Sequence, residues 1–225
     1  MKDKEKVEKI IFDSFLNEPF HNLYHIYDIK PKTYRHGGTC SEKTLSVYNN
    51  LKSEDISVKI WSAMVDGNET HRVLKIFIES GIYFADVGNA WPSIKMFPEK
   101  ENFEYESYGI TFKSVLDVET LDIYNCRDGR EILSVSIILD SKSEEEIFKD
   151  IENRFSSDID YPFKNHLRFA KIIGDKFYFL RDETVHVYSE KDSYKIDVCI
   201  SDEKDLERVL MKYFNFDLNR IKEQI

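Results

Sequence analysis

Arg35-His36-Gly37-Gly38-Thr39-Cys40 is the stretch around which we expect the chain to be organised. Neither glycine has a Cβ, so the backbone can turn tightly there and come close to a ligand. A helical pattern follows, since Leu45, Tyr48 and Leu51 fall on one face. A cysteine that begins a helix lies at the positive end of the helix dipole, which favours thiolate over thiol. The pattern indicates a nucleophilic Cys40, and the alternative is a packed thiol at a turn.

A β-hairpin is predicted downstream of this cysteine. Two apolar runs, 71–78 and 82–88, flank the short polar turn Glu79-Ser80-Gly81. A two-residue loop at that turn would place Asp86 diagonally across the hairpin from His71. Diagonal Cβ atoms are roughly 7–8 Å apart, which a carboxylate–imidazole hydrogen bond can span. A shift of the register by one residue would put the two side chains on opposite faces.

The residues Cys40, His71 and Asp86 follow one another in a pattern that resembles the arylamine N-acetyltransferase family. That family carries its cysteine in R-G-G-x-C, its aspartate in D-V-G, and a Cys-His-Asp triad. Here Gly37-Gly38-Thr39-Cys40 and Asp86-Val87-Gly88 match these motifs. The resemblance implies that Cys40 is the nucleophile, His71 the general base, and Asp86 the group that holds the imidazole ring.

Two further segments extend the resemblance over most of the chain. Pro19-Phe20-His21-Asn22-Leu23 resembles the family's P-F-E-N-L, and the run 206–218 resembles its closing helix and tail. The resemblance implies an α+β fold with an N-terminal helical bundle, a central antiparallel β-barrel and a C-terminal α/β lid around a cysteine-protease-like Cys-His-Asp core. It divides the chain into a helical domain with the nucleophile, a barrel with His71 and Asp86, an interdomain helix and the lid, at residues 1–54, 55–140, 141–157 and 158–225.

The resemblance also implies a reaction. The family transfers an acetyl group from acetyl-CoA to an arylamine, hydrazine or arylhydroxylamine through an acyl-cysteine, so we expect ping-pong kinetics. Gly67 and Asn68 match positions where the family's backbone meets the cofactor, although an ordinary hairpin turn explains them about as well. Gly38 and Thr70 are expected to contact substrate. A backbone N–H near Thr70, with that of Cys40, would stabilise the oxyanion.

The sequence departs from the family at three places. His36 stands where the family has arginine, with Arg35 one place earlier, and His21 replaces the glutamate of P-F-E-N-L. Asn89-Ala90 replaces the usual phenylalanine-glycine after D-V-G. We therefore expect an altered pocket, which keeps three other functions open: an amide synthase that uses a carrier-bound or longer acyl thioester, a thiol hydrolase or transglutaminase-like enzyme, and a non-catalytic binding protein.

The composition of the chain limits the kinds of molecule that it is expected to bind. The chain has 225 residues and 32 Lys+Arg against 42 Asp+Glu, a formal net charge of −10, which argues against a nucleic-acid or anionic-membrane surface. Lys59, Arg72 and Arg35 could still oppose this charge locally and favour an anionic cofactor. We expect a small-molecule amine or hydrazine as acceptor, and a monomer or weak homo-oligomer. No signal peptide and no apolar run of membrane-spanning length are predicted.

The three cysteines give no disulfide framework or zinc-site spacing, so a reducing cytoplasm is expected. Cys126 and Cys199 lie in strand patterns and are predicted to be core residues. His21 and His25 are four apart on a possible helix, but no third ligand accompanies them, so we predict packing histidines and no metal. Trp61 and Trp91 could line an aromatic pocket, with core packing as the alternative.

The remaining patterns predict the other elements. The expected helices span residues 4–16 and 20–24, with a loop over 25–39, and a later helix begins at Glu144-Glu145-Glu146 behind a Ser141 or Ser143 cap. Strands are expected over residues 57–60, 103–108, 115–124 and 132–139, and then short strands with turns at Gly174-Asp175 and Lys191-Asp192. Ser201 is expected to cap the last helix.

Overall fold

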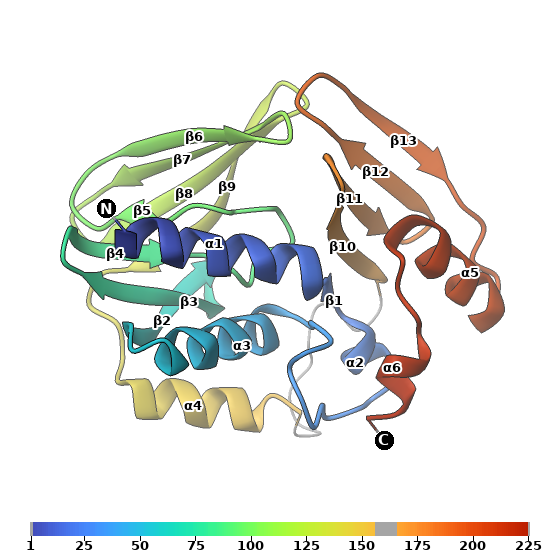
Figure 1. Ribbon diagram of the computed structural model, residues 1–225, viewed down its shortest axis with the longest axis horizontal. Helices are drawn as coiled ribbons and strands as arrows, with labels where there is room; N and C mark the ends of the chain where they lie inside the picture. The colour runs from blue at the N-terminus through green and yellow to red at the C-terminus, as the bar shows by residue number, and fades with distance from the viewer. Residues whose placement is uncertain (1, 156–165, 225) are drawn as a thin grey trace.

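The computed structural model describes residues 2–155 and 166–224. Its helices and strands form an N-terminal helical part, an eight-stranded antiparallel sheet that curls into a nearly closed barrel, and a five-stranded sheet with its own helices (Figure 1). This arrangement confirms the predicted α+β fold. The predicted boundary between residues 157 and 158 lies outside the described residues.

The N-terminal part packs two amphipathic helices against the barrel. Helix α1 (Lys2–Asn17) ends before Pro19, as the sequence predicts, and α3 (Cys40–Ser53) begins at the cysteine. Between them, α2 spans only Leu23–Ile26. The predicted helix over residues 20–24 is wrong at its start, because Phe20–His21 forms the short strand β1.

Strand β1 has a partner far along the sequence. It pairs antiparallel with β10 (Arg168–Ile173), so Phe20 lies opposite Ala170. This pairing satisfies backbone groups that a short isolated helix would leave exposed. A local pattern cannot reveal it, because its cause is a strand almost 150 residues away in the chain.

The eight-stranded sheet has the order β5-β4-β3-β2-β9-β8-β7-β6. Its strands are β2 (Ser57–Val65), β3 (Asn68–Ile78), β4 (Gly81–Ala85), β5 (Phe97–Pro98), β6 (Phe103–Ser107), β7 (Ile110–Leu116), β8 (Thr120–Arg127) and β9 (Arg130–Ile138). The single strand predicted over residues 115–124 is wrong, since a turn separates β7 from β8. Asp117 N–H donates to the Thr120 carbonyl in that turn.

The β3–β4 hairpin has the predicted two-residue loop. Ile78 pairs with Gly81, and the register continues to Leu74 opposite Ala85. Continued by one residue beyond the end of β4, this register sets Asp86 opposite Val73 and diagonal to His71, and the two side chains are hydrogen bonded. The predicted register is thereby confirmed.

The second sheet and its helices complete the chain. The sheet has the order β1-β10-β11-β12-β13, and we call β10–β13 with the two last helices the lid. The elements are α4 (Glu144–Asn153), β11 (Lys176–Arg181), β12 (Thr184–Tyr188), β13 (Ser193–Asp197), α5 (Glu203–Phe214) and α6 (Asn219–Lys222). Ser143 caps α4 as predicted, whereas Asp202, not Ser201, caps α5.

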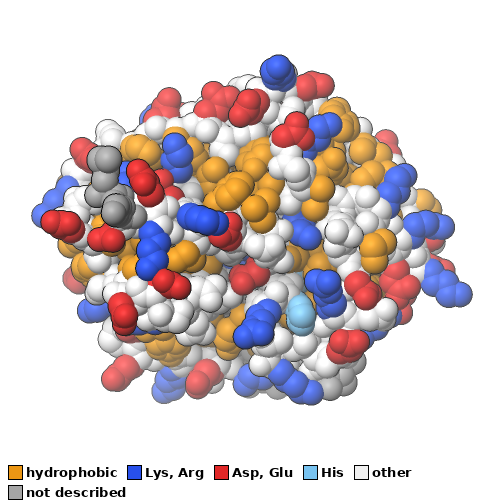
Figure 2. Space-filling view, viewed as in Figure 1, with side chains coloured by type: hydrophobic (Ala, Val, Ile, Leu, Met, Phe, Trp, Pro, Cys, Tyr) orange, Lys and Arg blue, Asp and Glu red, His pale blue; other side chains and the backbone are white. Residues whose placement is uncertain are grey.

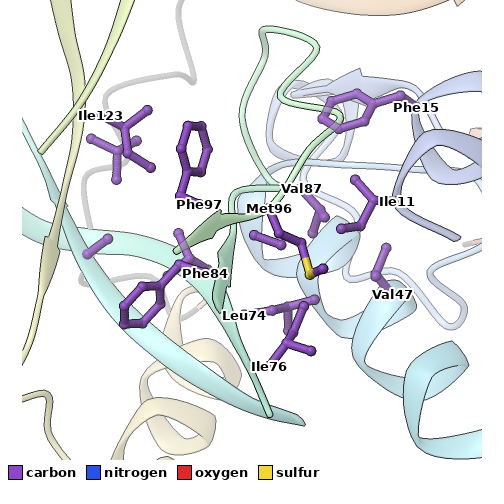
Figure 3. Packing of buried hydrophobic residues seen from close by; sticks show 14 of the residues in the cluster. Ile11, Phe15, Val47, Leu74, Ile76, Phe84, Val87, Met96, Phe97 and Ile123 are labelled. Atoms are coloured by element: carbon purple, nitrogen blue, oxygen red, sulfur yellow. The ribbon is translucent and has the colours of Figure 1, made fainter. Parts of the chain in front are cut away.

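The hydrophobic core joins the helices to the barrel. One buried cluster contains Ile11 and Phe15 of α1, Val47 of α3, Leu74 of β3 and Met96 just before β5 (Figure 3). This cluster extends to one side of the lid sheet, and a second cluster lies between the other side of that sheet and α5. The helices and the barrel therefore share one core.

The other two cysteines are not core residues, contrary to the sequence prediction. Cys126 lies in β8 but is partly exposed, and Cys199 lies beyond β13 and is exposed. In the described parts of the chain, no helix combines the length and apolar character that a membrane crossing requires.

Candidate active site

The glycine pair fits the cysteine loop against β1. A Cβ on Gly37 would lie 1.9 Å from the Pro19 carbonyl oxygen, and both glycines have positive φ, +82° and +142°. Gly38 N–H donates to that same carbonyl at 3.1 Å, and the Gly38 carbonyl accepts from His21 N–H at 2.9 Å. Only glycine fits this approach. Both backbone hydrogen-bonding groups of Gly38 thus have a partner within the protein. The contact of Gly38 with substrate stays a prediction.

Glu42 fixes the first turn of the helix that Cys40 begins. Its Oε2 accepts hydrogen bonds from the Thr39 N–H at 2.9 Å and the Thr39 hydroxyl at 2.8 Å. The bond from the Thr39 N–H is one half of a capping box, whose other half joins the Glu42 N–H to the Thr39 side chain. Its other oxygen forms an ion pair with Arg154, and both side chains are almost fully buried. The ion pair links the start of α3 to the residue that ends α4.

Cys40, His71 and Asp86 come together although they lie on three separate elements. His71 Nε2 lies 2.7 Å from Asp86 Oδ1, and both side chains are buried. Because Nε2 is hydrogen bonded to Asp86, Nδ1 is the ring nitrogen left for the thiol, and His71 lies close enough to act on the pKa of Cys40. Cys40 Sγ lies 3.8 Å from the Thr70 carbonyl.

The electrostatics favour a thiolate–imidazolium pair. Burial would raise the pKa of Cys40, but the hydrogen bond and charge of His71, with Arg72 and Arg154 nearby, lower it to about 7. Burial would lower the pKa of His71, but the charge and hydrogen bond of Asp86, together with Cys40, raise it to about 10. Between these two pKa values the thiol is ionised while the imidazole keeps its proton, which is the state of an activated nucleophile.

Asn89, expected from the sequence only as a change in the pocket, is hydrogen bonded to Asp86. The Asn89 side-chain N–H₂ donates to Asp86 Oδ2 at 2.7 Å and to the Ser134 hydroxyl at 2.9 Å. An Asn three residues after the aspartate, able to form an Asx-turn, is the signal that could have identified it. The two arginines near the thiol were also missed as a pair, because α4 brings Arg154 to the site from far along the chain.

The residues predicted to meet a cofactor lie on the β2–β3 turn. A Cβ on Gly67 would meet no atom within 4 Å, and Gly67 and Asn68 are both exposed. Asn68 donates a hydrogen bond from its side chain to the Asp66 carbonyl, so the turn is also locally stabilised. Thr70 is exposed at the start of the strand that carries His71.

The two tryptophans differ in surroundings. Trp61 donates from Nε1 to the Ile138 carbonyl at 2.6 Å, within the barrel. Trp91 packs against lid aromatics, with its ring centroid 4.9 Å from that of Phe179, and the Arg127 guanidinium lies 3.7 Å from it. Trp91 therefore joins the barrel to the lid.

Figure 2 shows apolar side chains gathered in the upper centre of this view, with charges of both signs scattered around them.

The two histidine departures from the family pattern lie together. His21 is fully buried, its Nε2 lies 3.0 Å from the His36 carbonyl, and its Nδ1 accepts from Leu23 N–H at 3.3 Å. Its ring stacks on Phe169. Burial lowers the pKa of His21 to about 3, so the ring is neutral. His25 stacks on Phe155, and within the described residues no group of three potential metal-binding side chains occurs.

Comparisons with known proteins agree with this architecture. No protein-family model and no curated protein sequence matches the chain. Among solved structures, it is similar to the Mycobacterium marinum arylamine N-acetyltransferase in complex with CoA, with a TM-score of 0.81 and 13% identity over 97% of this chain and 88% of that one. It is also similar to the Salmonella typhimurium enzyme of this kind (TM-score 0.79, 15% identity, 99% and 88% covered). A third similar structure is the arylamine N-acetyltransferase from Bacillus cereus, which is described as having a unique Cys-His-Glu catalytic triad. Its TM-score is 0.75 and its identity 16%, over 96% of this chain and 92% of that one. The chain has the fold of arylamine N-acetyltransferases.

Proposed function

We propose that this protein is an acyltransferase that takes an acetyl group from acetyl-CoA onto Cys40 and passes it to an arylamine, hydrazine or arylhydroxylamine. The observation that carries the proposal is the buried His71–Asp86 hydrogen bond beside a cysteine at the start of a helix. The fold shared with arylamine N-acetyltransferases supports it.

In the first half-reaction, the Cys40 thiolate attacks the thioester carbonyl. The developing oxyanion accepts from the Cys40 N–H at the start of α3 and from an N–H near Thr70. The intermediate collapses by breaking the bond to the coenzyme A sulfur, which takes the proton of the His71 imidazolium and leaves. The product of this step is acetyl-Cys40 with a neutral His71.

In the second half-reaction, the acceptor amine attacks acetyl-Cys40. His71 removes the proton from the attacking nitrogen, and Asp86 stabilises the imidazolium that forms. Collapse releases the amide and regenerates the thiolate–imidazolium pair. Because the donor must leave before the acceptor reacts, the kinetics are ping-pong.

The exposed β2–β3 turn is the part of the chain that we assign to the cofactor. Gly67 and Asn68 are exposed, and Asn68 begins the strand that carries His71. That a solved structure of this fold contains CoA supports the assignment. A free nucleophilic thiol needs a reducing compartment, which favours the cytoplasm.

Intact-protein mass spectrometry after incubation with acetyl-CoA tests the proposal, beside a Cys40→Ala variant. We expect a gain of one acetyl group in the wild-type protein, none in the variant, and loss of the adduct when an arylamine or hydrazine is added. An adduct formed only from longer or carrier-bound acyl thioesters would favour the amide synthase instead. An adduct that water discharges as fast as amine does would favour the hydrolase.

A further inference from the structure

Both oxygens of the Asp86 carboxylate are used, and by different residues. Oδ1 bonds to His71, and Oδ2 accepts the Asn89 N–H₂ at 2.7 Å. Asp86 is completely buried, so an oxygen without a donor would carry the full desolvation penalty of a carboxylate. Asn89 offsets part of that penalty at Asp86, the carboxylate that raises the pKa of His71.

The orientation of the Asn89 amide is fixed by a backbone group. Its Oδ1 accepts from Trp91 N–H at 3.1 Å, in an Asx-turn. A backbone N–H can only donate, so the amide oxygen must face Trp91 and the N–H₂ must face Asp86. The second amide hydrogen is directed at the Ser134 hydroxyl of β9, 2.9 Å away. Three of the four hydrogen bonds open to an Asn side chain are therefore made, and 8% of Asn89 is exposed.

Asn89 also contacts two residues outside the triad, Ser134 and Trp91. Ser134 lies on β9 and Trp91 packs against the lid, so Asn89 connects the strand-end segment after β4 with the barrel wall and the lid contact. We propose that Asn89 is a positioning residue that holds the Asp86 carboxylate in register with His71 and so sustains the thiolate of Cys40. The inference rests on the proposed function only in so far as the Cys40 thiolate is taken to be the acyl acceptor. The hydrogen bonds of Asn89 and the alkylation of Cys40 can both be studied without a substrate.

Other ionisable groups that act on this site stay unchanged in the test. Those acting on Cys40 are His71, Arg72 and Arg154, and Tyr105 lies within electrostatic range of Asp86. A shift seen on replacing Asn89 therefore reports the lost hydrogen bond and not the removal of a charge.

The experiment follows the rate of Cys40 alkylation by iodoacetamide from pH 5 to 10 in wild type, Asn89→Ala and Asn89→Leu, with the modified peptide identified by mass. If Asp86 loses its register with His71, the charge that holds the imidazolium acts less strongly, and we expect the alkylation midpoint of Cys40 to rise by about one pH unit, which is a tenfold change in the thiol–thiolate equilibrium. The leucine variant keeps the bulk of the side chain and provides a folded alternative if the alanine variant is too unstable. A midpoint that stays at the wild-type pH in a folded variant overturns the proposal.

The matched control is Asn22→Ala. Asn22 is also a buried asparagine with two bonds to backbone, from its Nδ2 to the His166 carbonyl and from Arg168 N–H to its Oδ1, but it lies at the start of α2. We expect this variant to lose stability and to keep the wild-type alkylation midpoint. An equal shift in the control would mean that Asn89 acts only through general stability, which also overturns the proposal. If the shift is found but acetyl-CoA leaves no adduct on wild type, the proposed acetyl transfer fails while the positioning role stands.

Discussion

A Cβ placed on Gly88 would lie 2.6 Å from the Cα of Cys40 and 2.7 Å from its Cβ. The segment after Asp86 therefore packs its backbone directly against the residue that begins α3. Gly88, the glycine of the D-V-G motif, has no unusual φ, so its backbone conformation does not call for glycine. The close approach to Cys40 does. The close contact brings the element that carries Asp86 against the element that carries Cys40.

The first prediction concerns this contact. In Gly88→Ala the new methyl group meets backbone, which cannot move aside as a flexible side chain can, so the segment or the start of α3 must shift. We expect a loss of about 1–3 kcal/mol in the free energy of unfolding and at least a tenfold slower alkylation of Cys40 at pH 7. Urea unfolding and thiol alkylation measure the two effects.

Gly174→Ala is the control for this prediction. Gly174 lies in the β10–β11 turn with φ +60°, and a Cβ there meets nothing within 4 Å. This variant should lose about 1 kcal/mol through backbone strain alone and alkylate at the wild-type rate. If Gly88→Ala behaves like Gly174→Ala, the packing argument is wrong.

The second prediction is the pH dependence of the thiol. Because His71 lowers the pKa of Cys40 to about 7, the thiolate forms as the pH rises through 7, and the alkylation rate should rise with it. Asp86→Asn removes the charge that holds the imidazolium, so the midpoint should move towards 9, the ordinary cysteine value. At pH 7 this is a decrease of about 50-fold in the thiolate fraction. Alkylation of the exposed Cys199 in the same samples provides the internal reference. Unchanged profiles in Asp86→Asn would show that Asp86 does not sustain the pair.

The sequence predicted the parts of this molecule that depend on neighbours in the chain. The hairpin that aligns Asp86 with His71 follows from a two-residue loop and alternation of apolar residues, and the fold followed from the motif around Cys40. The Ser143 cap of α4 follows from a serine placed three residues before a glutamate, and the structure has this capping box.

What the sequence could not predict depends on distant partners. Phe20–His21 is a strand only because β10 offers an edge, and Arg154 reaches Glu42 only because α4 packs beside α3. Asn89 was read as a lost phenylalanine, since its role needs the positions of Asp86, Ser134 and Trp91 at once. In each case local propensity was overridden by a contact that no short pattern contains.

The third prediction concerns the buried ion pair of Glu42 and Arg154. Removing one partner leaves an uncompensated buried charge, so Arg154→Met and Glu42→Gln should each cost about 3–5 kcal/mol of unfolding free energy. The double variant should cost less than the sum of the two, because neither charge is then left alone. Arg154→Met should also raise the alkylation midpoint of Cys40, since Arg154 helps to lower that pKa. A double-mutant cycle by urea unfolding measures the coupling, and additive losses would contradict the pairing.

The fourth prediction tests the cofactor turn. Gly67→Ala adds a methyl group that meets no protein atom, at a φ of +76°, so the stability should fall by only about 1 kcal/mol. If acetyl-CoA lies against this backbone, the KM for acetyl-CoA should rise several-fold with little change in kcat. Gly129→Ala offers the same φ region and the same open space on the β8–β9 turn, which is not part of the segment assigned to the cofactor. Equal KM values in the two variants would place the cofactor elsewhere.

The fifth prediction concerns acid stability, through His21. Its pKa in the folded protein is lowered to about 3, below the value of 6.5 in an unfolded chain. The unfolded chain therefore takes up the proton first, and the stability that the neutral ring contributes is present above pH 6.5 and is lost as the pH falls towards 3. At pH 5 the loss from this one residue is about 2 kcal/mol.

Urea unfolding at pH 7.5 and pH 5.0 measures this loss in wild type and in His21→Gln. The variant cannot titrate at this position, so its stability should fall by about 2 kcal/mol less between the two pH values. His166→Ala removes an exposed histidine whose pairing with Asp182 is a surface contact, so its pH dependence should match wild type within about 0.5 kcal/mol. If His21→Gln loses as much stability on acidification as wild type, the folded protein must accept a charged His21 ring stacked on Phe169. The neutral hydrogen-bonding arrangement assigned to His21 would then be wrong.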